Sequence, residues 1–494
     1  MIESQKGINS GKVYTSFFWK VLERLLSQGI NLIVQVVLAR LLLPSDFGSL
    51  AIIVAITNYA AIFVQSGIGT VIIQKKNIDK KDLSTIFTIS LGTAFIFYIS
   101  LFISAPLIAN YYGILILKPA LRVLALVLFL NAINAVQTAV LSKKMKFKQL
   151  FLRTAIAVPV AGIVGISMAY WGFGIWALIF HNLVNMMTVV IFMSFDKDVK
   201  AIRLGFYKDR IRGLYSFSIK VLFSSLVSGM HDMLRTMIIG KKYSSNDLAY
   251  YDKAYTYSYY AVSIVNSSIS TVLLPAFSKS QDDTARLKEM SRKSVRMSAF
   301  IMIPAMIGIA SIARPLTLTI LTSKWEQCVP FLILFCILRI PTFIMTIDKQ
   351  VYYAMGRSEI NLYYEIALCL LNILTLFITT QLGIIYVAVG ATLVEYIGCI
   401  AICVIASKIY KYTLKERVAD IYKPILSSLI MAVVIFIISK INCGSSLITL
   451  FAQILLGIIS YALSSCVLKD MNIVEIKNIV ESILHKKCKE EKND

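Results

Sequence analysis

The chain has 494 residues, of which 57% are hydrophobic and only 16% are charged, and its formal net charge is +23. Soluble domains carry about a quarter charged residues, so this composition excludes a water-soluble protein. Apolar runs of about twenty residues, the length that crosses a bilayer core, recur from end to end. A membrane β-barrel is also excluded, because its strands would alternate apolar and polar residues. We therefore predict an all-α integral membrane protein.

The hydropathy pattern predicts about fourteen transmembrane helices. In chain order the predicted spans cover residues 17–40, 49–72, 83–108, 119–141, 154–172, 174–194, 216–239, 252–277, 297–317, 328–348, 360–380, 384–407, 424–439 and 446–467. Residues 1–15 are short and polar, which is not typical of a secretory signal peptide. The charged residues of the first span weaken its hydropathy signal.

Basic residues gather in every second loop. Lys and Arg are dense in residues 75–81, 143–153, 197–212, 279–296 and 408–423, whereas the alternate connections are almost without them. Cytoplasmic loops of membrane proteins carry such an excess, so we expect both termini in the cytoplasm. The positive charge then requires no partner beyond membrane lipids, and we expect no nucleic acid.

The chain resembles itself at a shift of about 200 residues, the test for an internal repeat. Ser66–Ile73 then aligns with Ser267–Leu274, and Lys20–Leu22 aligns with Lys220–Leu222. We predict two six-helix lobes, 1–205 and 206–410, an extra helix pair, 411–467, and an amphipathic and disordered cytoplasmic tail, 468–494. Transporters built from such repeats bind substrate where the repeats meet.

The first and seventh spans carry matching rows of polar residues. Spacings of four, four, three and four place each row on one helical face. The first row is Lys20, Arg24, Gln28, Asn31 and Gln35, and the second is Lys220, Ser224, Ser228, His231 and Arg235. Charges within a membrane face a protein interior or a watery cavity, so matched cationic rows favour a cavity that accepts an anion. The alternative is polar contact between helices, with internal ion pairs such as Glu23 with Lys20 or Asp232 with Arg235.

Other polar groups inside the spans give weaker signals. Asn131, Asn134 and Gln137 share one face of the fourth span, and Asn58 and Gln65 share one face of the second. Six tyrosines between Tyr250 and Tyr260 indicate either stacking on sugar rings or an interfacial aromatic belt. We expect the charged residues near span ends to reach toward the membrane surface; these are Arg122, Arg339, Asp348 and Glu365.

Pro44 and Asp46 predict a turn, because proline ends the first helix and the carboxylate can cap the next one. Eight cysteines without a C-x-x-C pair predict neither a metal site nor disulfides. The sequence also lacks H-E-x-x-H and a phosphate-binding loop, and it has no long segment outside the spans. We therefore expect neither a cofactor nor catalysis.

Several segments resemble bacterial polysaccharide flippases. They are Ala39–Gly48 (ARLLLPSDFG) with Gly67-Ile68-Gly69 after the second span, Ile239–Ala254 in the second half, and Tyr353–Arg357 (YAMGR) after the tenth span. Such proteins form the O-antigen and polysaccharide branch of the multidrug/oligosaccharidyl-lipid/polysaccharide exporter superfamily. The resemblance covers essentially the whole chain, although its motifs mark turns and loops rather than substrate contacts.

The resemblance implies a V-shaped pair of lobes in the bacterial inner membrane. It also implies outward transport of undecaprenyl-diphosphate-linked oligosaccharide by alternating access, with polysaccharide polymerase and chain-length proteins as possible partners. On that basis, Lys20, Arg24, Lys220 and Arg235 are expected to bind the diphosphate. Gln28, Asn31, Gln35, Ser224, Ser228, Tyr255 and Tyr259 are expected to bind sugar, and His231 with Asp232 is a candidate for proton coupling.

Two other functions stay open. A cation-coupled multidrug exporter of the same fold would carry carboxylates and aromatic residues in its cavity, where this chain has cationic rows. A membrane-embedded polysaccharide polymerase usually needs a sizeable external loop, and every predicted outer loop here is short.

Overall fold

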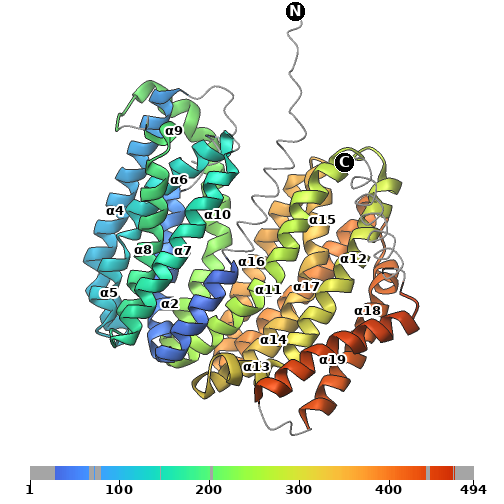
Figure 1. Ribbon diagram of the computed structural model, residues 1–494. Helices are drawn as coiled ribbons and strands as arrows, with labels where there is room; N and C mark the ends of the chain where they lie inside the picture. The colour runs from blue at the N-terminus through green and yellow to red at the C-terminus, as the bar shows by residue number, and fades with distance from the viewer. Residues whose placement is uncertain are drawn as a thin grey trace, which may run out of the picture. The chain divides into compact units, whose positions relative to one another are not determined.

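The computed structural model describes residues 28–65, 72, 79–144, 146–200, 204–440, 446–470 and 472, and within these ranges every regular element is a helix. The chain forms two compact units, residues 1–252 and 253–494. Figure 1 shows the helices of each unit running roughly side by side as a bundle. The predicted fold class, an all-α membrane protein, is confirmed.

The first unit begins with a helix over Gln28–Leu41 and contains the helices up to α10 and the start of α11. Their bounds are α2 Pro44–Gln65, α4 Lys80–Tyr112, α5 Leu117–Leu124, α6 Val127–Lys143, α7 Phe147–Tyr170, α8 Ile175–Ser194, α9 Lys197–Lys200, α10 Lys208–Lys242 and α11 Ser245–Ser278.

The second unit contains the rest of α11 and the helices that follow it. Their bounds are α12 Thr284–Ser311, α13 Ala313–Ile320, the 3₁₀ helix η1 Ser323–Cys328, α14 Val329–Arg339, α15 Thr342–Ala354, α16 Ser358–Leu382, α17 Ile384–Ile409, α18 Leu414–Ser439 and α19 Ser446–Val467.

Each of the fourteen predicted spans overlaps a helix, the first only from residue 28 onward. Within the described ranges, eleven helices are long and apolar enough to cross a membrane, and α11, bent by 44°, would be a twelfth. The helix Gln28–Leu41 is too short in its described part, and α10 carries many charged residues. The count of fourteen therefore stays a prediction.

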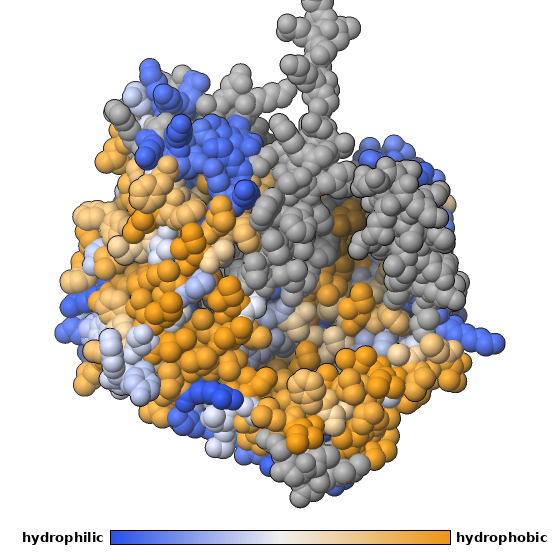
Figure 2. Space-filling model, in the orientation of Figure 1, coloured by the Kyte–Doolittle hydropathy of each residue, from blue (hydrophilic) through white to orange (hydrophobic). Residues whose placement is uncertain are grey.

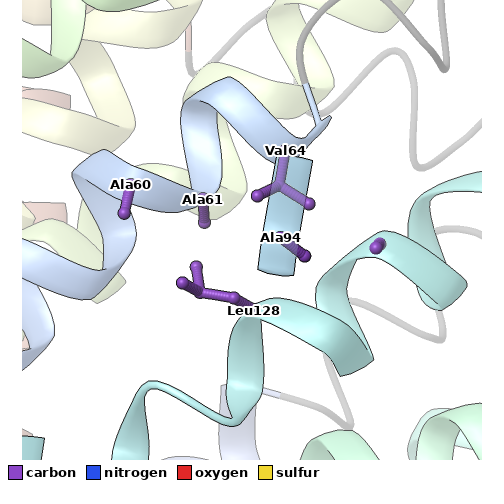
Figure 3. Close-up of a cluster of buried hydrophobic side chains, with 6 residues drawn as sticks. Ala60, Ala61, Val64, Ala94 and Leu128 are labelled. Atoms are coloured by element: carbon purple, nitrogen blue, oxygen red, sulfur yellow. The ribbon is translucent and has the colours of Figure 1, made fainter. Parts of the chain in front are cut away.

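Small side chains let the helices of the first unit approach closely. Ala60, Ala61 and Val64 of α2 face Ala94 of α4 and Leu128 of α6, and all five are buried (Figure 3). Close approach of small residues is the usual source of helix packing in a membrane, where lipid is as apolar as leucine. Figure 2 shows apolar side chains over the flank of this unit and hydrophilic ones gathered at the end that carries α9.

The turn before α2 confirms a structural role for Asp46, although its partners differ from the predicted ones. Its carboxylate accepts from the backbone N–H of Leu43 at 3.2 Å and from that of Ile175, the first residue of α8. Neither donor is an N–H of α2, so the predicted cap of that helix is not formed, and Asp46 instead ties the turn to the start of α8. Two residues on, a Cβ added to Gly48 would lie 1.7 Å from the carbonyl oxygen of Ser245, so only glycine allows α2 to meet the start of α11.

The helix α10 packs within the first unit. A Cβ on Gly229 would lie 2.5 Å from the Ile62 side chain, and the Tyr112 hydroxyl donates to the carbonyl of Met237 at 3.2 Å. The sequence repeat begins a second lobe at residue 206, whereas the contacts group residues up to 252 with the first unit. The repeat itself stays a prediction.

In the second unit, the tenth predicted span consists of two helices, α14 and α15, separated at Pro341. Proline lacks an N–H and its ring crowds the carbonyl four residues earlier. That carbonyl, of Ile337, accepts from the backbone N–H of Ile340 at 3.1 Å and from the Tyr396 hydroxyl at 3.1 Å. The Thr342 hydroxyl donates to the Arg339 carbonyl at 2.7 Å. A backbone N–H and two side-chain hydroxyls thus satisfy the carbonyls at the break, as lipid requires.

Two charged residues that were expected at the membrane surface are buried. Asp348 is 0% exposed and Arg339 is 9% exposed, so the prediction that they reach toward the surface is wrong. Asp348 accepts from the Arg417 guanidinium of α18 at 2.9 Å and from the Tyr410 hydroxyl. The compensating charge, on Arg417, belongs to a helix about seventy residues later in the chain. The local sequence around Asp348 does not reveal this contact.

Candidate substrate-binding site

The first predicted polar row lies only partly in the structure. Lys20 and Arg24 fall outside the described residues. Gln28, Asn31 and Gln35 lie on the helix Gln28–Leu41 and are half-buried. This helix meets α7 closely, since a Cβ on Gly162 would lie 2.6 Å from the Val34 side chain.

The second predicted row lies on α10. Lys220, Ser224 and Ser228 belong to this helix, but their side chains are outside the described part. Arg235 is buried and pairs with Asp232 at 2.9 Å (Nη1 to Oδ1). The His231 Nδ1 lies 3.7 Å from the same carboxylate oxygen. The ion pair that the alternative interpretation proposed is therefore present, and Arg235 carries a charge that Asp232 partly balances.

The two tyrosines expected to bind sugar lie together on α11. The Tyr259 side chain is 46% exposed, and Tyr255 packs edge-on against Phe335 with 5.3 Å between ring centroids. Both rings lie beside the Arg339 guanidinium, whose carbon is 4.5 Å from the Tyr255 centroid and 5.3 Å from that of Tyr259.

A polar cavity of about 480 Å³ opens inside the first unit, between α2, α5, α6, α7 and α8. Its volume lies in the range of pockets that bind small molecules. Six carboxamides line it: Asn58, Gln65, Asn131, Asn134, Asn182 and Asn185. Each amide offers both a donor and an acceptor, so the wall suits a ligand rich in hydroxyl groups.

Arg153 supplies the positive charge of this cavity. Its Nη1 donates to the Asn134 Oδ1 at 3.0 Å and to the Thr138 hydroxyl at 2.8 Å. Among the described residues that line the cavity, none is a carboxylate. The cavity therefore combines neutral hydrogen-bonding groups with one cation, which suits an uncharged or anionic polyhydroxyl ligand and disfavours an organic cation.

The sequence predicted only part of this wall. The shared faces of Asn58 with Gln65 and of Asn131 with Asn134 are both found in the cavity. Arg153 was counted only as a basic loop residue, and Asn182 with Asn185 was not singled out. The three-residue spacing of Asn182 and Asn185 would have placed them on one face of α8. Among the described residues, no group of three or more His, Cys, Asp or Glu side chains could hold a metal ion.

The many long apolar helices define a multi-pass membrane protein. The fold is similar to that of the lipid II flippase MurJ in an inward closed conformation, with a TM-score of 0.76 over 93% of this chain and 100% of that chain at 18% identity. It is also similar to an inward-facing multidrug resistance MATE family transporter of the MOP superfamily, with a TM-score of 0.60 over 77% of this chain and 94% of that one at 14% identity.

The chain belongs to the polysaccharide biosynthesis protein family, whose profile matches residues 37–330. The lipopolysaccharide biosynthesis protein WzxC of Escherichia coli (strain K12) is 22% identical over 384 residues, which are 77% of this chain and 78% of that protein. The teichuronic acid biosynthesis protein TuaB of Bacillus subtilis (strain 168) is 24% identical over 396 residues, 78% of this chain and 80% of that protein. The predicted resemblance to polysaccharide flippases is confirmed at the level of the family.

Proposed function

We propose that this protein is a flippase that moves undecaprenyl-diphosphate-linked oligosaccharide units from the cytoplasmic to the outer leaflet of the bacterial inner membrane. Membership of the polysaccharide biosynthesis family supports this function, as do relatives named for lipopolysaccharide and teichuronic acid biosynthesis. The fold, similar to that of a lipid II flippase, agrees with it.

The amide-lined cavity of the first unit is the observation that carries the proposal. Sugar hydroxyls both donate and accept hydrogen bonds, as carboxamides do. A wall of six amides with Arg153 can therefore bind a saccharide in many orientations, which suits a protein that must release its cargo. Arg153 and the cations of the predicted polar rows would bind the phosphate groups by charge-assisted hydrogen bonds.

Transport would proceed by alternating access, with the saccharide carried in polar surroundings and the polyprenyl chain left in lipid. The protein would act as a transporter and not as an enzyme, without a cofactor. Its partners would be the lipid-linked oligosaccharide, membrane lipids, and the polymerase and chain-length proteins of the same biosynthetic system. His231 beside Asp232 is the proposed candidate for proton coupling.

The basic loops support cytoplasmic termini. Lys144 lies 2.6 Å from Asp198, and Lys146 lies 3.1 Å from Asp196, so the loops after α6 and α8 form one ion-pair cluster. Hydrogen bonds from Lys144 and Lys146 hold the pKa of Asp198 below its usual value, so its carboxylate stays charged to a lower pH than a free aspartate. Cytoplasmic loops carry such basic residues, and the predicted topology places both termini on that side.

Complementation tests the proposal directly. A strain that lacks its own lipid-linked oligosaccharide flippase would receive this gene on a plasmid. Restored surface polysaccharide, together with loss of the accumulated lipid-linked intermediate, is the expected result. Failure to rescue strains with several different glycans would contradict the proposal.

A cation-coupled multidrug exporter is the second candidate, because the fold is also similar to MATE transporters. It would need an acidic cavity for organic cations, and the described lining of the cavity contains no carboxylate. Resistance to cationic dyes without rescue of glycan export would favour this candidate.

A further inference from the structure

A buried arginine, Arg339, lies at the break between α14 and α15. It does not line the cavity of the first unit. Arg339 is the last residue of α14 and is 9% exposed. Among the described residues its guanidinium makes no ion pair within 4 Å and no hydrogen bond, and its Nε and Nη2 atoms are fully buried without a partner. Arginine stays charged in proteins, so these donors persist at every physiological pH.

An unsatisfied buried donor costs about 1–3 kcal/mol, and more when it is charged. The surroundings offset part of this cost. The Tyr255 and Tyr259 rings flank the guanidinium, and such contacts stabilise a cation by about 0.5–2 kcal/mol. The position at the C-terminus of α14 is also favourable for a positive charge. Neither contact uses the N–H groups, which remain available to an acceptor.

The charged residues around Arg339 leave its N–H donors unoccupied. Glu395 of α17 interacts electrostatically with Arg339 but forms no ion pair with it. Lys349 of α15 also acts on Glu395, and it is paired with Glu365 of α16. Glu395 therefore balances the charge of Arg339 from a distance without occupying its donors. The ring of Tyr259 is half-exposed, so the cluster of Arg339, Tyr255 and Tyr259 reaches the surface of the second unit.

We propose that Arg339, Tyr255 and Tyr259 form an anion-binding subsite in the second unit. Its ligand is an anionic group of the lipid-linked saccharide, either a phosphate of the lipid diphosphate or a carboxylate of an acidic sugar. This inference rests on the proposed function. Guanidinium binds both oxyanions through paired N–H donors, and the two rings provide flat surfaces for an adjoining sugar. Broken helices in transporters are commonly placed at substrate sites, which agrees with the position of Arg339.

The test measures binding to the purified full-length protein in lipid nanodiscs with two probes. Polyprenyl diphosphate without sugar represents the phosphate source, and a soluble oligosaccharide containing glucuronate represents the carboxylate source. Loss of charge-assisted hydrogen bonds in Arg339→Gln should weaken binding of one probe by about ten- to a hundred-fold. Arg339→Lys should recover part of the affinity. Glu395→Gln should tighten binding of the same probe, because it removes a repelling charge.

Arg122→Gln is the matched control. Arg122 of α5 also stacks on an aromatic ring, with its guanidinium carbon 4.1 Å from the Phe102 centroid, but its Nε is bonded to the Phe102 carbonyl at 3.2 Å. Binding by this variant should equal that of the wild type. The probe that responds to Arg339→Gln identifies the source of the anion.

Unchanged binding of both probes by a folded Arg339→Gln variant would overturn the subsite. If that variant does not fold, binding is measured with Tyr259→Leu and Glu395→Gln. If Arg339 has only a structural role, neither variant should change the affinity for either probe. Rescue of glycan export by the wild-type gene tests the proposed function separately. Rescue by both wild type and Arg339→Gln, with equal affinities, would refute the subsite alone.

Discussion

At the scale of single residues, Arg153 fixes the character of the cavity in the first unit. It holds the Asn134 and Thr138 side chains through hydrogen bonds and adds the cavity's positive charge. We expect Arg153→Ala to reduce export of lipid-linked oligosaccharide at least tenfold, since hydrogen bonds to charged groups contribute about 1.5–3 kcal/mol. Glycan export in the complemented strain measures this effect.

Lys148→Ala is the control for that prediction. Lys148 lies on the same helix, α7, but is exposed and does not line the cavity. Export by this variant should stay at the wild-type level. Equal export by Arg153→Ala and Lys148→Ala, at equal amounts of protein in the membrane, would contradict the role of the cavity.

The buried pair Asp348 and Arg417 allows a second prediction. Asp348→Asn leaves the Arg417 charge buried without its partner, and such changes cost about 3–5 kcal/mol. Replacing both residues, as Asp348→Leu with Arg417→Met, should recover most of the loss because no buried charge remains. Thermal unfolding of the three purified variants measures the difference. If the double variant is as unstable as Asp348→Asn, the prediction fails, and the pair stabilises the protein by more than balancing two buried charges.

At the scale of elements, the contact between α2 and the start of α11 depends on one glycine. Gly48→Ala would bring a Cβ within 1.7 Å of the Ser245 carbonyl oxygen, so we expect it to lower the yield of folded protein sharply. Gly92→Ala on α4 meets nothing within 4 Å and should change stability by no more than about 1 kcal/mol. Size-exclusion profiles of fluorescent fusions compare the two. Equal profiles would argue against a close contact there.

The positions of the helices were predictable from hydropathy, because each predicted span overlaps a helix. Hydropathy did not predict which helix faces pack against one another. Periodicity placed Asn131 and Asn134 on one face of a helix, but only the packing of α6 against α8 brings that face to Asn182 and Asn185. The break at Pro341 had a local signal in the proline itself, whereas the burial of Asp348 depends on a distant helix.

At the scale of the whole molecule, sequence and packing divide the chain at different places. The predicted repeat begins its second half at residue 206, while the boundary between the two compact units falls between residues 252 and 253. The grouping of helices reflects which helix faces pack together, and not the self-similarity of the sequence. The helix α10 therefore starts the predicted second repeat and yet packs on α2, with Gly240 against the Ile52 side chain.

The charge distribution predicts the topology of the whole chain. Loops rich in Lys and Arg alternate with loops that contain far fewer, so both ends should lie in the cytoplasm. A reporter that is active only in the cytoplasm, fused after Asp494, should be active, and one that requires the outer side should not. The reverse pattern would contradict the predicted topology.

Flipping in a purified system tests the central claim most directly. Proteoliposomes would contain this protein and a lipid-diphosphate-linked oligosaccharide, and an added glycosidase would digest only the saccharide in the outer leaflet. We predict that the protein makes the protected, inner-leaflet saccharide accessible, and that Arg153→Ala leaves it protected. Continued protection in the presence of folded wild-type protein, with several saccharides, would contradict the proposal that this protein is a lipid-linked oligosaccharide flippase.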